Sequence, residues 1–186
     1  MAQLIYSAIV SLDGFIADSE GNFDWAMPSD EVHAFFNELE RPIGTYLYGR
    51  RMYDVMRYWE TTGPEADERA VERQYRGIWQ SADKIVYSRS LSRASTARTR
   101  IEREFIPEQI QALKHNSNSD ISIGGPELAA QALRADLVDI CHIVFVPVSV
   151  GGGTRFLPAD LFLHLTLRDE RRFANGMVQL SYSIQT

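Results

Sequence analysis

Short apolar runs alternate with amphipathic stretches through most of the chain. The apolar runs predict buried strands over residues 4–12, 45–48, 84–87, 121–123 and 137–146. Helical spacing predicts helices over residues 29–39, from 50 onward, and over 64–81, 107–115 and 126–134. Two late strands, 163–173 and 177–184, flank an Asn-Gly dipeptide that favours a hairpin. The pattern predicts an α/β domain with a mixed sheet that ends in an antiparallel hairpin.

The chain has 186 residues, without an internal repeat, a low-complexity run or a linker. This length lets one domain bury its own core, so we expect a single domain over residues 1–186. Its apolar runs are too short to span a membrane, and the N-terminus lacks the pattern of a signal peptide. We therefore expect a cytoplasmic protein with no membrane partner.

The formal net charge is −6 at pH 7. Nucleic acids and anionic lipids favour a basic surface, so we expect neither as a partner. Cys141 is the only cysteine and lies in an apolar run, which predicts a buried thiol and excludes an intramolecular disulfide. The histidines are scattered without the spacing of metal ligands, at positions 33, 115, 142 and 164. We therefore expect no metal site.

The clearest chemical signal is the run Ile-Ser-Ile-Gly-Gly-Pro-Glu-Leu-Ala at 121–129. Gly124 and Gly125 let the backbone approach a ligand closely, because no Cβ is in the way. Pro126 suits the first position of a helix, whose free N–H groups favour an anion. Such a junction suits a phosphate group. The same junction also ends strands in α/β proteins that bind nothing there.

Other candidate turns follow the remaining predicted strands. They are Asp13-Gly14, Gly49-Arg50-Arg51 and Ser88-Arg89-Ser90. Ligands of open α/β sheets bind outside the carboxyl ends of the strands. Arginine and hydroxyl groups suit a phosphate monoester. The alternative is that these arginines are solvated loop charges.

Four motifs occur in order along nearly the whole chain. They read SLDGFIA at 11–17, YGRRMY at 48–53, IGGPEL at 123–128 and PVSVGGGTRF at 147–156. In this order they resemble the dihydrofolate reductase-like family. The resemblance points to the branch that includes the reductase domain of the riboflavin-biosynthesis deaminase–reductase and its stand-alone relatives. It implies a three-layer sandwich around a mixed, mostly parallel sheet.

The resemblance also implies NADPH as cofactor, lying across the carboxyl edge of the sheet. Gly49 and Arg50 match a turn that contacts cofactor phosphate. Ser88 and Arg89 match a turn near the 2′-phosphate, and Gly124 and Gly125 match a pair that is often joined by a cis peptide. The sequence does not reveal the isomer. The adjoining residues complete the cofactor-binding candidates: Arg51, Pro126 and Glu127.

Two acids are candidates for substrate binding and proton delivery. The run at 25–30 resembles the Trp-x-x-Pro-x-Asp run of bacterial dihydrofolate reductases, in which the acid binds the pterin ring. Asp30 would take that role, although an acid in the first turn is also favourable for the helix dipole. Asp13 is the rival, with a turn residue as its alternative. His33, one turn after Asp30, is expected at the surface.

The sequence departs from the riboflavin branch at two positions. Ile123 precedes the glycine pair where the branch often has an acid, and Ser7 stands where it tends to have a lysine. Both differences count against a phosphoribosylamino-pyrimidine substrate. The zinc-deaminase patterns His-x-Glu and Pro-Cys-x-x-Cys do not occur in the sequence.

The resemblance favours an NADPH-dependent reductase that transfers a hydride to a C=N or C=O bond. The substrate would be a small carbonyl or heterocyclic compound, pyrimidine-like or pterin-like, and 5-amino-6-(5-phosphoribosylamino)uracil reductase is the related activity. The alternative is a non-catalytic member of the fold that binds a nucleotide or metabolite. We also expect a homodimer, because the late strands leave a sheet edge and family relatives are often dimeric.

Overall fold

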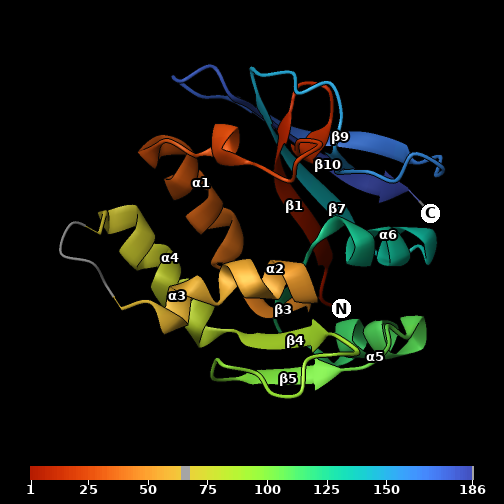
Figure 1. Ribbon diagram of the computed structural model, residues 1–186. Helices are drawn as coiled ribbons and strands as arrows, with labels where there is room; N and C mark the ends of the chain where they lie inside the picture. The colour runs from red at the N-terminus through yellow and green to blue at the C-terminus, as the bar shows by residue number, and fades with distance from the viewer. Residues whose placement is uncertain (64–67, 186) are drawn as a thin grey trace.

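The computed structural model describes residues 1–63 and 68–185, and a central sheet of eight strands organises them (Figure 1). The strand order is β5-β4-β3-β6-β1-β7-β10-β9. The bounds are β1 Leu4–Ser11, β3 Ile43–Gly49, β4 Asp83–Tyr87, β5 Thr99–Glu102, β6 Asp120–Gly124, β7 Ile140–Val146, β9 His164–Arg172 and β10 Val178–Gln185. Strands β5, β4, β3, β6, β1 and β7 run parallel to one another, and β10 and β9 add an antiparallel hairpin beside β7. The predicted mixed, mostly parallel sheet with a terminal hairpin is confirmed.

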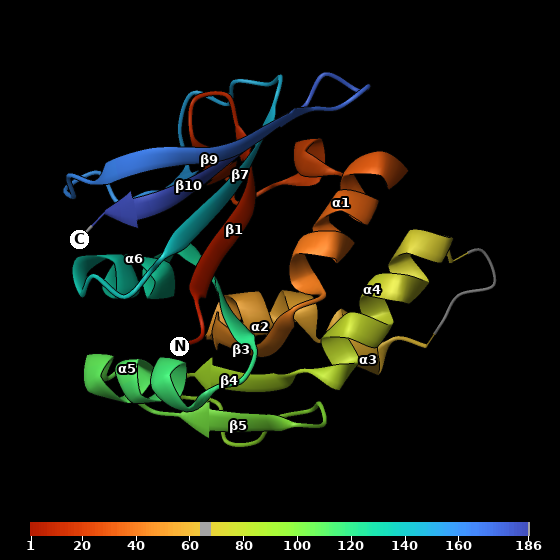
Figure 2. The ribbon, with the colours of Figure 1, turned by 180° about the vertical axis from the view of Figure 1, so that it is seen from behind.

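Helices cover both faces of this sheet. Their bounds are α1 Asp30–Glu40, α2 Arg50–Met56, α3 Tyr58–Thr61, α4 Ala70–Ser81, α5 Pro107–Asn116 and α6 Pro126–Arg134. Figures 1 and 2 show α1 to α4 gathered together, with α5 and α6 apart from them. A small two-stranded sheet joins β2 Phe15–Ala17 to β8 Thr154–Arg155. No helix within the described residues has the length and apolar character needed to cross a membrane.

Alternation along the strands explains the three layers. Successive strand side chains point to opposite faces. Tyr6 and Ile123 thus belong to a core with residues of α5 and α6, whereas Ile5 and Tyr48 belong to a second core with residues of α2 and α4. Val32 anchors α1 on β7 in a third cluster on the same face as α2 and α4.

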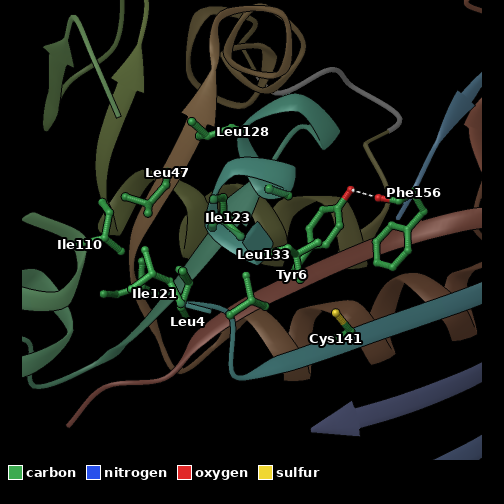
Figure 3. Packing of buried hydrophobic residues seen from close by; sticks show 14 of the residues in the cluster. Leu4, Tyr6, Leu47, Ile110, Ile121, Ile123, Leu128, Leu133, Cys141 and Phe156 are labelled. Atoms are coloured by element: carbon green, nitrogen blue, oxygen red, sulfur yellow. Dashed lines mark hydrogen bonds between the residues drawn. The ribbon is translucent and has the colours of Figure 1, made fainter. Parts of the chain in front are cut away.

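The larger core also fixes the loop that follows β7 (Figure 3). The rings of Tyr6 and Phe156 stack at 4.2 Å, and the Tyr6 hydroxyl donates to the Phe156 carbonyl at 3.1 Å. Cys141 lies in the same core with 1% of its surface exposed, which confirms the predicted buried thiol. Burial raises the pKa of this thiol to about 12, so it stays protonated at neutral pH.

Two element boundaries differ from the sequence prediction by three residues or more. Helix α4 begins at Ala70 rather than at 64, and residues 64–67 lie outside the described residues. The strand predicted from Leu137 begins at Ile140. The Leu137 N–H donates to the Ala132 carbonyl at 3.0 Å and closes α6, so the first apolar residues of the run belong to the helix end.

The prediction that His33 lies at the surface is wrong. Its side chain is buried, with 8% of the residue exposed. The ring meets Trp59 and Tyr75 edge-on at 6.2 and 5.8 Å, and Nδ1 lies 3.2 Å from Asn37 Oδ1. Helices α3 and α4 cover the face of α1 that the sequence pattern leaves polar.

Candidate active site

The predicted turns come together at the carboxyl edge of the sheet. Because β1, β6, β3 and β4 are neighbouring parallel strands, the turns that follow them lie along one edge in that order. Gly49 ends β3 and precedes α2, while Gly124 ends β6 and pairs in register with Tyr48. Asp13 follows β1 and Ser88 follows β4. The structure thus brings together the segments that the sequence analysis singled out.

Two glycines at this edge have distinct reasons to be glycine. A Cβ on Gly124 would lie 2.8 Å from Tyr48 Cε1 and 3.2 Å from Met52 Cγ, so packing alone excludes a side chain. Gly125 has φ of 97° and precedes α6, with no side chain capping the helix. A Cβ on Gly125 would lie 3.8 Å from the Gly49 nitrogen. The ends of β3 and β6 therefore approach closely, beside the free N–H groups of α6.

This edge fits a bound phosphate or pyrophosphate. Pro126 occupies the first turn of α6, and the helix N-terminus attracts an anion.

All peptide bonds of the described residues are trans, the Gly124–Gly125 bond included.

The predicted arginines lie at the rim of this edge. Arg51 Nη1 lies 3.4 Å from Glu127 Oε1, and both side chains are exposed. Arg50 Nε donates to Asp54 Oδ2 at 2.7 Å, one helical turn along α2. Arg89 is exposed. Their binding of cofactor phosphate stays a prediction.

Ser88 has a clear structural role. Its hydroxyl accepts a hydrogen bond from the Leu91 N–H at 3.0 Å, and its carbonyl accepts one from Arg103 Nη1 at 2.8 Å. The residue is buried, with 7% exposed. Ser88 therefore shapes the turn that carries Arg89, and its predicted contact with the cofactor stays a prediction.

Asp13 binds the loop that follows β7. Its carboxylate accepts hydrogen bonds from the N–H groups of Gly151 at 2.7 Å and Val150 at 3.2 Å. Hydrogen bonds from the Ser11 hydroxyl and from these N–H groups hold the Asp13 pKa well below its ordinary value. An acid that stays ionised suits a structural clamp better than a proton donor.

Asp30 begins α1 and is largely exposed. Its Oδ1 accepts from Arg69 Nη1 at 2.7 Å, and 67% of its side chain is exposed. A cavity lies between α1 and the sheet. Asp30 does not line this cavity under α1, although Pro28 and His33 on either side of it do.

The cavity lies between α1 and the sheet and has a volume of about 270 Å³. Helix α1 contributes His33, Phe36 and Glu40, whose spacing places them on one face. The remaining walls come from β1, β3, β6 and helices α2 to α4, through residues Ser7, Ile9, Tyr46, Tyr48, Met52, Met56, Trp59, Tyr75, Ser122, Ile123 and Gly124. Gly124 therefore belongs both to the cavity and to the sheet edge formed by Gly49, Gly124, Gly125 and the start of α6 (the glycine edge).

The cavity contains polar groups that the sequence analysis missed. Glu40 is 7% exposed and Tyr46 is 1% exposed. Within the part of the chain that the structure describes, neither Glu40 Oε2 nor the Tyr46 hydroxyl makes a hydrogen bond, and the same is true of Ser7 Oγ. Burial raises the pKa of Glu40 to about 7, against a smaller lowering by the nearby Tyr46 hydroxyl, which does not reach full hydrogen-bond geometry with the carboxyl. The spacing of Glu40 from His33 and Phe36 is the sequence signal that points to this face.

Comparisons with known proteins address the family. A family model described as the RibD C-terminal domain matches residues 2–179. The chain is 29% identical over 182 residues to the uncharacterized protein YyaP of Bacillus subtilis (strain 168), which covers 97% of this chain and 94% of YyaP. It is 26% identical over 178 residues to the uncharacterized protein YwjB of the same organism, which covers 95% of this chain and 91% of YwjB.

Solved structures share the fold. A protein from Shewanella sp. PV-4 named for riboflavin biosynthesis matches with a TM-score of 0.78 and 20% identity, covering 100% of both chains. A pyrimidine reductase-like protein from Corynebacterium diphtheriae matches with a TM-score of 0.68 and 17% identity, over 100% of this chain and 92% of that one. A deaminase/5-amino-6-(5-phosphoribosylamino)uracil reductase from Thermotoga maritima matches at 0.66 and 14%, over 99% of this chain and 57% of that one.

These matches confirm the resemblance that the four motifs carry, and the sheet order and helix layers agree with it. The dihydrofolate reductase-like sandwich is likewise confirmed as the fold. The chain belongs to the RibD C-terminal domain family.

Proposed function

We propose that the protein is an NADPH-dependent reductase that transfers a hydride to a C=N or C=O bond of a small heterocyclic or carbonyl compound. The observation that carries this proposal is the junction at Gly124, where a phosphate-binding type of edge adjoins an aromatic cavity. A cofactor on the edge and a substrate in the cavity would meet there. The names of the Corynebacterium diphtheriae and Thermotoga maritima proteins, both of them reductases or reductase-like, support the reaction class.

NADPH, when bound, supplies the hydride. The close backbones at Gly49, Gly124 and Gly125 would admit the cofactor, and the first turn of α6 at Pro126 and Glu127 would hold its pyrophosphate. The arginines at the rim of the edge would hold the 2′-phosphate of NADPH, and Ser88 would shape the turn that carries Arg89. These rim residues are Arg50, Arg51 and Arg89.

The protein would orient the substrate and exclude water from it. Aromatic walls suit a flat ring: Tyr46 and Tyr48 stack at 5.4 Å with an interplanar angle of 9°, and Trp59 meets Tyr75 edge-on at 4.9 Å. Asp30 remains a candidate for substrate binding beside the cavity, since Pro28, two residues before it, lines the cavity.

Titration of the protein with NADPH, followed by tryptophan fluorescence, tests the cofactor. We expect saturable binding in the micromolar range, tighter than that of NADH. Arg89→Ala should weaken NADPH binding by about 1.5–3 kcal/mol, the value of a charged hydrogen bond. Arg93→Ala is the matched control, because Arg93 is also exposed and lies in the same loop. A folded wild type that binds no NADPH would contradict the proposal.

The second candidate function is a non-catalytic binder of a nucleotide or metabolite. It is favoured by the position of Asp30 and Asp13, because both carboxylates already hold protein partners. NADPH oxidation with a panel of carbonyl and heterocyclic compounds separates the two. Turnover supports the reductase, whereas binding without any turnover supports the binder.

We also propose a homodimer. Strand β9 forms one edge of the sheet and is exposed along its whole length, with 37% of Leu165 and 52% of Leu167 exposed. An open strand edge is suited to pairing. Size-exclusion chromatography with light scattering at micromolar concentration should give twice the chain mass. A monomer would contradict the dimer.

A further inference from the structure

The cavity under α1 presents polar atoms that the protein itself leaves without partners. Glu40 Oε2, the Tyr46 hydroxyl and Ser7 Oγ are buried and make no hydrogen bond of full geometry within the described residues, although the Tyr46 hydroxyl lies near the Glu40 carboxyl, and all three residues line the cavity. Buried polar atoms are almost always paired, because an unmade hydrogen bond is destabilising. Three such atoms around one cavity indicate a bound molecule that supplies their partners.

Glu40 lies in surroundings that disfavour a negative charge. It is the last residue of α1, at the negative end of the helix dipole. No ion pair among the described residues includes it. The titratable groups that line the cavity with it are His33 on α1, Tyr46 and Tyr48 on β3, and Tyr75 on α4.

None of these groups supplies a positive charge at neutral pH. Burial lowers the pKa of His33 and raises those of the three tyrosines. Burial likewise raises the pKa of Glu40 to about 7. The Glu40 carboxyl therefore carries a proton in a large fraction of molecules at neutral pH, so it can donate a hydrogen bond as well as accept one.

The walls of the cavity select the shape and charge of the ligand. They are aromatic or apolar over most of their area, and among the described residues that form them there is no lysine or arginine. A phosphate group needs such cations, so the cavity suits an uncharged, flat ring. A carboxylic acid pairs with a ring nitrogen that accepts and an adjacent amino group that donates. Amino-substituted nitrogen heterocycles have this edge.

We propose that Glu40 binds the substrate through this edge and donates the proton that completes its reduction. The proton-donating part rests on the proposed reductase function, with NADPH as the source of the hydride. The carbon of the C=N or C=O bond accepts the hydride with its two electrons. The nitrogen or oxygen accepts the Glu40 proton, and the carboxylate that remains regains a proton from water after the product leaves.

Binding of 2-aminopyrimidine to the wild type tests the recognition. Pyrimidine, which lacks only the amino group, is the matched probe, and the tryptophan fluorescence of the protein, to which Trp59 in the cavity wall contributes, reports the binding. We expect saturable binding of 2-aminopyrimidine at millimolar concentration and at least tenfold weaker binding of pyrimidine. The affinity for 2-aminopyrimidine should fall severalfold between pH 6 and pH 9, as Glu40 loses its proton.

Variants of Glu40 separate recognition from packing. Glu40→Gln keeps a donor and an acceptor, so it should bind 2-aminopyrimidine within threefold of the wild type and without the pH dependence. Glu40→Leu removes both and should weaken binding at least tenfold. Glu38→Gln is the matched control, because Glu38 lies on the exposed side of α1 and pairs with Arg41. It should behave as the wild type. Tyr46→Phe, which keeps the ring, should weaken binding about threefold.

Three results would overturn the proposal: no binding of 2-aminopyrimidine by the wild type, equal binding by Glu40→Leu, or an affinity that does not change with pH. Circular dichroism establishes that each variant is folded, and the Tyr46→Phe and Glu40→Gln results decide the matter if Glu40→Leu does not fold. NADPH titration of the same proteins tests the reductase function separately. Probe binding that depends on Glu40, without NADPH binding, would refute the reductase and leave the recognition intact.

Discussion

The glycine edge and the cavity under α1 adjoin at Gly124, yet they treat polar groups in opposite ways. At the edge, two polar side chains have partners: Asp13 accepts from Gly151, and Arg50 binds Asp54. In the cavity, Glu40 and Tyr46 have buried polar atoms that make no hydrogen bond within the described residues. The edge offers mainly backbone groups, whereas the cavity offers side-chain polar atoms. Our proposal accordingly places cofactor binding in the first region and substrate chemistry in the second.

The largest expected effect is the loss of turnover when Glu40, the proposed proton donor in the cavity, is replaced. With any substrate that the wild type reduces, Glu40→Gln should lower kcat by about 10²–10⁴-fold, the usual contribution of a general acid. KM should change little, because glutamine keeps the hydrogen bonds. The wild-type kcat should also fall as pH rises above about 7, the pKa of Glu40, and Glu40→Gln should lack this limb.

Steady-state kinetics between pH 5.5 and 9 provides the check. Glu38→Gln should match the wild type throughout. A Glu40→Gln enzyme with unchanged kcat would place the proton donor elsewhere, with Asp30 as the next candidate.

The second effect concerns stability and pH. The folded-state pKa of Glu40, about 7, lies above the ordinary 4.5, so the folded protein binds more protons than the unfolded chain between these values. The free energy of unfolding should therefore be highest below pH 4.5 as far as Glu40 is concerned. It should fall by about 3 kcal/mol as pH rises to 7 and beyond.

Urea denaturation of wild type and Glu40→Gln at several pH values isolates this contribution. The variant should gain stability relative to the wild type as pH rises from 4.5 to 8. A constant difference between the two proteins would show that Glu40 titrates normally.

The third effect tests the residue that the two regions share. Gly124→Ala places a Cβ 2.8 Å from the Tyr48 ring, and overpacking of this kind costs about 1–3 kcal/mol. Displacement of Tyr48 should also weaken probe binding in the cavity. Thermal unfolding measures the loss, with Gly152→Ala as control, because a Cβ there meets no atom within 4 Å. Equal stability of the two variants would mean that Tyr48 yields without cost.

The smallest effect concerns Asp30. Its ion pair with Arg69 is largely exposed, and exposed pairs contribute about 0–1 kcal/mol. Asp30→Asn should therefore change stability by no more than this amount and leave the pH dependence of probe binding unchanged. Loss of that pH dependence would move the acid from the cavity to the start of α1.

The glycine edge was predictable because its signals are local. Gly124, Gly125 and Pro126 mark a strand end and a helix start in consecutive residues, and the helix begins where they indicate. The hairpin at Asn175-Gly176 was predictable for the same reason. At such positions the residue type is determined by the local backbone conformation, so a few consecutive residues are enough to predict it.

The cavity was not predictable because its residues come from distant segments. His33 was expected at the surface of its helix, and Glu40 was not among the candidate residues. Only the packing of α3 and α4 over α1 buries His33, through Trp59 and the helices' aromatic residues. Polar residues on the covered face of α1 can be identified as cavity residues only when the positions of α3 and α4 are known.

The most direct test of the account is a crystal structure of the wild type with NADPH. We predict that the pyrophosphate lies at the N-terminus of α6 and that the nicotinamide ring lies against Gly124, facing the cavity that contains Glu40. A nicotinamide ring placed away from Gly124, with the cavity closed off from it, would contradict the claim that the edge and the cavity form one active site.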